Sequence, residues 1–242
     1  MSINMANVKS ITLGGVSVKK IEDTNGNVLW SGGESEYRKL DYIKFSGNEY
    51  VYLSDVSLSL DNARFDITFE YTYLNNSQAI FGSGSSDRDY DIQTSGKYLY
   101  GKSSSIYNNL VDNGKYKLTV NTGSSSSNTS VSTSVYDYQN GTTKNTSRNL
   151  SNTFALLSFS YIGCFETDGN KSNYFKSKLF EFNFTRNGNV LIKKVTLVPC
   201  QRKSDNVCGL YDTTRQKFYP MAGTVITDGA RGNVVDENWD LT

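Results

Sequence analysis

Apolar and polar residues alternate with a period of two along most of this chain. In residues 65–74, FDITFEYTYL, every second position is aromatic or aliphatic, and the positions between them are mostly Asp, Thr or Glu. Successive side chains of a β-strand point to opposite faces, so the pattern predicts a strand with one buried face and one polar face. Residues 115–122 and 178–188 repeat it, with the apolar positions Tyr116, Leu118, Val120, Phe180, Phe182 and Phe184. Helical periodicity is almost absent, which indicates an all-β chain.

Turn residues separate these strands at roughly regular intervals. Asn-Gly or Gly-Asn pairs occur within residues 25–27, 113–114, 140–141 and 187–189, where they supply the positive φ of tight turns. Many short strands joined by such turns are typical of an antiparallel sandwich or barrel. We therefore expect an antiparallel sandwich of two sheets over residues 37–230, preceded by a unit of residues 1–36 and followed by a tail, residues 231–242.

The first unit is predicted to be a small β-hairpin anchor with a linker. Residues 8–30, VKSITLGGVSVKKIEDTNGNVLW, read as three short strands. A unit of this size cannot bury enough apolar surface to be stable alone. We expect it to attach the chain to another surface through four apolar residues: Ile11, Leu13, Val28 and Trp30.

Three further segments bear on the architecture. Residues 121–153 are rich in Ser, Thr and Asn; a disordered linker is one interpretation, and a solvated hairpin, which we favour, is the other. Residues 197–224 read as a series of hairpins in which Pro199 ends a strand. The tail either docks on the sandwich through Trp239 or bridges to a neighbouring subunit.

Charge and hydropathy exclude some partners. The net charge is +1, so no summed field favours nucleic acid or an anionic membrane surface. No apolar run is long enough to span a bilayer, and no signal peptide is recognisable; we expect no membrane insertion and folding in a cytoplasm. The cysteines Cys164, Cys200 and Cys208 are expected to be small buried residues, with a Cys200–Cys208 bridge as the alternative.

Histidine is absent from the chain. Its absence removes the most common general base and the usual partner of a nucleophilic serine or cysteine. Paired carboxylates remain the one enzymatic possibility, and the closest candidates are Asp66 and Glu70 on the polar face of one predicted strand. A solvated outer face explains both residues better, so we expect no enzymatic activity.

Two groups of residues are candidates for binding. Asp87, Asp89 and Asp91 alternate and could share one face of a strand, which makes them weak candidates for a calcium site; no other cofactor is expected. Tyrosines are numerous and lie among Ser, Asn and Gly, a composition suited to stacking on sugar rings or to protein interfaces. Our candidates for ligand contact are Tyr90, Tyr98, Tyr100 and Tyr107.

The segment LVPCQRKSDNVCGLYDTTRQKFYPMAGT, residues 197–224, closely resembles the C-terminal signature of laminin-G-like, concanavalin-A-type domains of tailed-bacteriophage virion proteins and gut bacterial surface proteins. The usual form is close to LIPCRRKSDGVVGMYDxxxxKFYxNAGTG. This chain departs from it at Asn206, where glycine is usual, and at Pro220 and Met221. Residues 37–53 and 178–195 resemble the family's opening and penultimate strands, and residues 8–30 are similar to segments that attach such domains to the particle.

The resemblance implies a jelly-roll sandwich and no catalytic residues. It implies a virion protein, assembled in the host cytoplasm, that forms an exposed fibre, a tail or a capsid-decorating module and adheres to host surface glycan. Its partners would be other virion proteins, further copies of itself and possible host polysaccharide. The alternatives are a purely architectural virion protein and a bacterial surface lectin.

Overall fold

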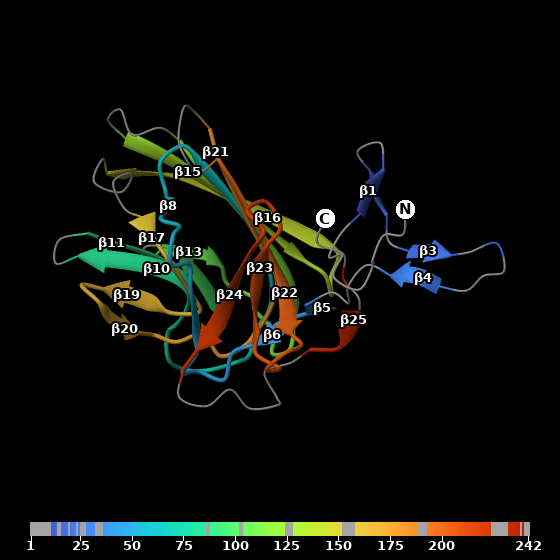
Figure 1. The fold of residues 1–242 in the computed structure, drawn as a ribbon. Coiled ribbons are helices and arrows are strands. Elements are labelled where there is room, and N and C mark those ends of the chain that lie inside the picture. Colours follow the sequence, from blue (N-terminus) through green and yellow to red (C-terminus); the bar gives the residue numbers. More distant parts are fainter. Residues whose placement is uncertain are drawn as a thin grey trace.

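The structure is a computed structural model and describes residues 11–13, 16–18, 20–22, 24, 28–31, 36–85, 88–101, 104–123, 128–151, 158–187, 193–223, 232–237 and 239. All regular elements in these ranges are strands, most of them antiparallel (Figure 1). The prediction of an all-β fold is confirmed. In the same ranges no helix has the length and apolarity to cross a membrane.

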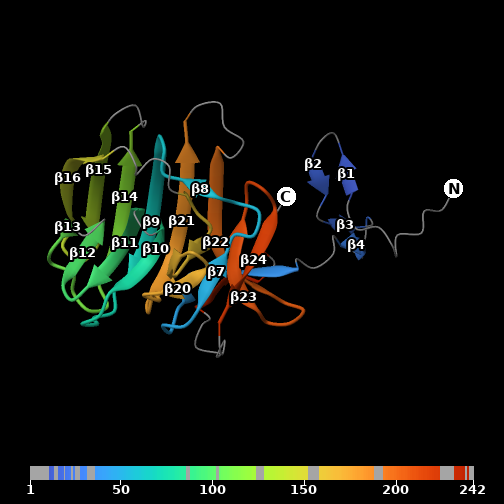
Figure 2. The same ribbon diagram turned by 90° about the vertical axis from the view of Figure 1, so that its left-hand side faces the viewer.

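A first run of strands makes up one side of the molecule (Figure 2). Its members pair in the order β16 (Thr142–Ser151), β15 (Asn128–Asp137), β14 (Lys115–Thr122), β9 (Ala63–Glu70), β21 (Lys178–Arg186), β22 (Lys194–Arg202), β23 (Cys208–Asp212) and β24 (Lys217–Ala222). Short strands extend it: β5 (Tyr37–Leu40) on β22, β6 (Ile43–Lys44) on β21 and β25 (Val234–Asp236) on β5.

A second run lies across the core from the first. It comprises β7 (Tyr50–Tyr52), β18 (Tyr161–Ile162), β10 (Gln78–Ser85), β11 (Arg88–Ser95), β12 (Tyr98–Gly101) and β13 (Ser104–Tyr107), again in pairing order. Two short strand pairs accompany it. In the first, β19 (Phe165–Thr167) runs parallel to β10 and pairs with β20 (Asn170–Ser172). In the second, β8 (Leu58–Ser59) pairs with β17 (Ser158–Phe159).

The two runs are joined into one nearly barrel-shaped sheet. Strand β24 pairs with β23 as far as Pro220 and with β7 from Met221 onward. At the opposite end of the pairing order, the hydroxyl of Tyr107 in β13 donates a hydrogen bond of 3.1 Å to the carboxylate of Asp137 in β15. The sheet is therefore folded over on itself and fastened at both ends.

The alternating apolar residues form an aromatic core between the runs. Phe81 of β10 stacks on Phe159 with 4.4 Å between ring centroids, and on Phe65 of β9 with 5.2 Å. Phe182 of β21 meets Phe81 edge to face at 5.8 Å. All four rings are buried, so the two runs share one set of aromatic contacts, which adds to their hydrophobic burial.

The N-terminal segment forms two hairpins. Strand β1 (Ile11–Leu13) pairs with β2 (Val16–Val18), and β3 (Lys20–Glu22) pairs with β4 (Val28–Ser31). The segment thus contains four strands where we expected three. None of the four pairs with the large sheet in the described residues, and the side chains of the predicted attachment residues Ile11, Leu13, Val28 and Trp30 lie outside the description.

The Ser/Thr-rich segment is a hairpin of ten register pairs between β15 and β16, so the hairpin prediction is confirmed. Strand β15 is more deeply integrated than expected, because Val131 and Val135 are buried in the core. The turns at Asn113 and Gly141 have the predicted positive φ, 59° and 63°. Asn206 has φ 58°, so it adopts the left-handed conformation that favours glycine.

Two expectations about strand geometry are wrong. Pro199 does not end a strand: it lies inside β22, opposite Leu210. On the other side of β22, β21 pairs as far as Leu197 and β5 pairs from Cys200, so the missing proline N–H falls in a gap between partners. Phe180 does not share the buried face of β21, because a bulge between Leu179 and Glu181 shifts the register.

The three cysteines are free and buried, as predicted. Cys200 lies opposite Gly209, and Cys208 lies opposite Gln201. Directly opposed residues share a face and successive residues alternate, so the two thiols lie on opposite faces of the sheet and cannot form a bridge without a change of register.

The C-terminal tail docks on its own chain. Strand β25 pairs with β5, Arg38 forms an ion pair of 3.2 Å with Glu237, and the Trp239 ring lies 5.6 Å from that of Tyr211. Of the two roles considered for the tail, docking is the one that these residues show.

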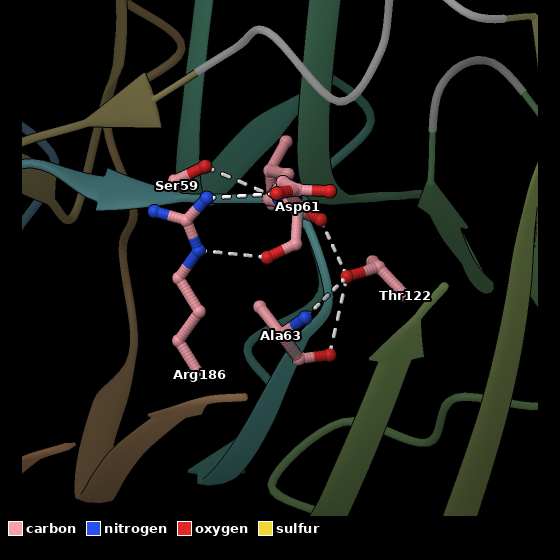
Figure 3. Close-up of polar contacts among 6 residues, drawn as sticks. Ser59, Asp61, Ala63, Thr122 and Arg186 are labelled. Carbon is pink, nitrogen blue, oxygen red and sulfur yellow. Dashed lines mark hydrogen bonds and ion pairs between the residues drawn. The ribbon is translucent and has the colours of Figure 1, made fainter. Parts of the chain in front are cut away.

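A polar corner locks the start of β9 to β14 and β21 (Figure 3). The hydroxyl of Thr122 accepts a hydrogen bond of 2.9 Å from the Ala63 amide and lies within bonding distance of the carbonyl oxygens of Leu60 and Ala63. Beside it, Arg186 donates to the carbonyl oxygen of Asp61 at 2.9 Å and to its carboxylate at 2.8 Å.

Replacing Thr122 by valine should test this corner. Thr122→Val keeps the shape of the side chain but leaves buried backbone groups without partners, and we expect a loss of about 1–3 kcal/mol in the free energy of unfolding. Urea titration followed by tryptophan fluorescence measures it. Thr143→Val, at an exposed position of β16, is the matched control and should stay within about 0.5 kcal/mol of the original protein. Equal losses in both variants would contradict the role given to the corner.

Candidate polar-groove binding site

An open groove of about 390 Å³ crosses the outer face of β14, β15 and β16. Every residue that lines it is an amide or a hydroxyl residue: Asn121, Ser132, Thr133, Ser134, Asn145, Thr146 and Ser147. Strand alternation places five of these residues outward, because in β15 the valines face the core while Ser132 and Ser134 face outward. The buried Thr133 and its partner Thr146 alternate to the other face. The groove, defined by these residues, is our candidate for a binding site.

Register arranges the groove side chains in two rows across the strands. Asn121, Ser132 and Ser147 are opposite one another in successive strands, and so are Thr119, Ser134 and Asn145. Neighbouring strands are about 4.8 Å apart, so each row presents its donors and acceptors over about 10 Å. Amides and hydroxyls both donate and accept, and the groove can therefore pair with ligand groups of either kind.

Exposed aromatic rings continue the same face of β15. Tyr136 and Tyr138 are 36% and 46% exposed and meet edge to face at 4.9 Å. The ammonium group of Lys115 lies 5.4 Å from the centre of the Tyr138 ring and 3.9 Å from that of Phe180, which positions these rings. Flat apolar plates beside hydrogen-bonding groups are a common combination in ligand sites.

At its β9 side the groove meets an ion pair. Arg64 donates two hydrogen bonds to the carboxylate of Asp66, at 2.6 and 2.9 Å, and Thr119 donates a third at 2.6 Å. Burial alone would raise the pKa of Asp66, but the hydrogen bonds from Arg64 and Thr119 outweigh it and hold the pKa below the ordinary value. Asp66 is therefore ionised at neutral pH, the wrong protonation state for a general acid.

The other carboxylates of this face are also engaged. Glu70 forms an ion pair of 2.7 Å with Lys178. Glu181 accepts a hydrogen bond of 2.6 Å from the amide of Asn183 and one of 3.3 Å from Thr68. The Asp66 and Glu70 pair considered above thus takes part in polar networks that support the face.

The structure describes the side chains of two of the four predicted ligand tyrosines, Tyr98 and Tyr107. Tyr98 is 44% exposed in β12. Tyr107 is only 7% exposed, and burial and the hydrogen bond to Asp137 raise its pKa to about 12; its ring is not offered to a ligand. The strand positions of Tyr90 and Tyr100 are described, but their side chains lie outside the description.

The acidic run is only partly described. Asp91 is buried opposite Gly82 in β11, whereas Asp87 and the side chain of Asp89 lie outside the described residues. In the described part, no three His, Cys, Asp or Glu residues gather closely enough to hold a metal ion.

Sequence reasoning missed the groove and one further surface. The signal for the groove was present in residues 131–135, VSTSV, whose serines had to face outward once the valines faced the core. The other surface joins β7 and β18, where Tyr52 and Tyr161 stack at 4.8 Å and the ammonium of Lys171 lies 4.9 Å from the Tyr50 ring and 4.8 Å from the Tyr161 ring. These tyrosines meet only through strand pairing, which a single sequence does not reveal.

No protein-family model matches the chain, and no curated protein matches it.

The contributions of the buried Tyr107 hydroxyl and the exposed Tyr98 hydroxyl to stability can be compared by replacing each tyrosine with phenylalanine. Tyr107→Phe removes a donor from the buried Asp137 carboxylate and should lower the free energy of unfolding by about 1–2 kcal/mol. Tyr98→Phe removes a hydroxyl at a position that is 44% exposed, where water can replace a lost contact, and should change it by less than about 0.5 kcal/mol. Chemical denaturation of both variants measures the difference, and an unchanged stability in Tyr107→Phe would contradict the fastening role of this hydrogen bond.

Proposed function

We propose that this protein is a glycan-binding module of a bacteriophage virion, adhering to host surface polysaccharide without chemical turnover. The single observation that supports this most is the groove, which is lined only by amide and hydroxyl residues and has Tyr136 and Tyr138 beside it. Sugars offer hydroxyl groups and apolar ring faces. Hydroxyl and amide side chains can form hydrogen bonds with the sugar hydroxyl groups, and exposed aromatic rings can stack on the apolar ring faces.

We further propose that the fold is a concanavalin-A-like jelly-roll sandwich whose two sheets are the two strand runs, joined along one edge through β24. The aromatic contacts of Phe81 with Phe65 and Phe182 across the core support this assignment. So does the hairpin series β22–β23–β24, which coincides with the segment that resembles the family signature. In such sandwiches an outer sheet face is a rigid platform for a ligand.

The virion assignment rests on the sequence resemblance. Under this proposal the hairpins of β1 to β4 attach the module to other virion proteins, and the large sheet faces outward. Assembly takes place in the host cytoplasm, several copies act together as in most symmetric particles, and no cofactor is required. Immuno-electron microscopy with antibody against residues 37–229 tests the location, and labelling absent from purified particles would contradict it.

Groove variants should lose glycan binding without losing stability. Asn145→Ala removes an exposed amide from the groove, and hydrogen bonds worth about 1–1.5 kcal/mol predict a five- to tenfold weaker affinity, roughly. Asn170→Ala, at an exposed position of β20 on the other run, is the matched control. A glycan array identifies the ligand, and titration calorimetry measures both variants against it.

The outcomes also separate the proposal from its main alternative. Binding that weakens in Asn145→Ala and is unchanged in Asn170→Ala supports the groove as the adhesion site. If no glycan is retained while the module is present on the particle, an architectural virion protein is the better description.

A further inference from the structure

The groove offers a ligand no ionised group. None of its seven lining residues is ionisable, and the outward positions of β16 on either side of it, Thr143 and Asn149, are also neutral. The two basic residues of β16 alternate away from Asn145 and Ser147 to the face of Thr146, because Lys144 is opposite the buried Val135 and Arg148 is opposite the buried Val131. Lys144 is in addition engaged, donating to Asn108 at 3.3 Å.

The basic residues next to the groove interact with acidic or aromatic groups of the protein itself. Arg64, opposite Asn121, is bound to Asp66. Lys117, opposite Tyr136, lies close enough to Asp66 to lower its pKa. Farther along the same face, Lys178 is paired with Glu70. Arg64 thus already has its counter-charge, and the ammonium group of Lys115 lies over the Tyr138 and Phe180 rings.

A charged sugar would lose hydration in this groove without gaining an opposite charge. Removing water from a carboxylate or sulfate is unfavourable unless the charge is paired, and neutral amides and hydroxyls compensate this only partly. An uncharged sugar hydroxyl exchanges its hydrogen bonds to water for similar hydrogen bonds to amides and hydroxyls at little cost. Building on the proposed function, we propose that the groove selects uncharged polysaccharide segments and discriminates against acidic ones.

The test is a comparison of polymers on the full chain. Immobilised protein is exposed to dextran, mannan and galactan, and to the acidic polymers polygalacturonate and alginate, between about 0.05 and 0.5 M NaCl. We expect retention of at least one neutral polymer, an affinity that changes by less than about twofold across the salt range because no ion pair is screened, and no retention of the acidic polymers.

A charge-gain variant provides the positive control. Ser147→Lys adds an ammonium group at an exposed groove position and should create salt-sensitive retention of acidic polymers. Ser172→Lys adds the same charge at an exposed position of β20 and should not. Both positions are exposed, so both variants are expected to fold.

Each result of the polymer-retention experiment tests one part of the proposal. Retention of acidic polymers alone, weakened by salt, would overturn the selectivity while leaving glycan adhesion intact. Retention of acidic polymers by Ser172→Lys as strongly as by Ser147→Lys would show that the groove is not the site of discrimination. Failure to retain any polymer, neutral or acidic, would overturn the proposed function itself and the inference with it.

Discussion

The aromatic contacts between β9 and β10 are the interaction on which the rest of the structure depends. Phe65 and Phe81 belong to different strand runs, and their stacking at 5.2 Å brings the two buried faces together. Every strand that presents apolar residues to this core must present its alternate residues outward. The polar face of the sheet is thus a consequence of how the core packs. The outward residues can be replaced by others without changing the packing of the core.

Much of this architecture could be predicted from the sequence, because alternation is a local property. It predicted the all-β class, the hairpin of β15 and β16 and the burial of the cysteines. It failed where a contact between distant segments decided the outcome. A bulge in β21 turned Phe180 away from the core, and the hydrogen bond to Asp137 explains why Tyr107 is fixed and buried. The groove combines residues of three strands, so its position required the register.

The two prolines show how pairing overrides a local rule. A proline inside a strand is expected to end it or to mark an edge. Here Pro199 lies where β22 passes from β21 to β5, and Pro220 lies where β24 passes from β23 to β7. A strand that changes partner leaves a position without a ladder bond on one side, and a residue without an N–H fits there. The fold-over of the sheet through β24 and the proline at its bend have the same physical origin.

A neutral groove on a rigid sheet also affects the conditions under which the protein can bind. The chain has no histidine, and Asp66, beside the groove, is held ionised by Arg64 and Thr119. No group at the groove therefore changes charge between about pH 5 and 8. Recognition by hydroxyls and amides is insensitive to protonation and to salt screening. Its affinity per site is modest, since each neutral hydrogen bond contributes only about 1 kcal/mol. Under the proposed function, several copies bound to one polymer would increase the overall strength of adhesion.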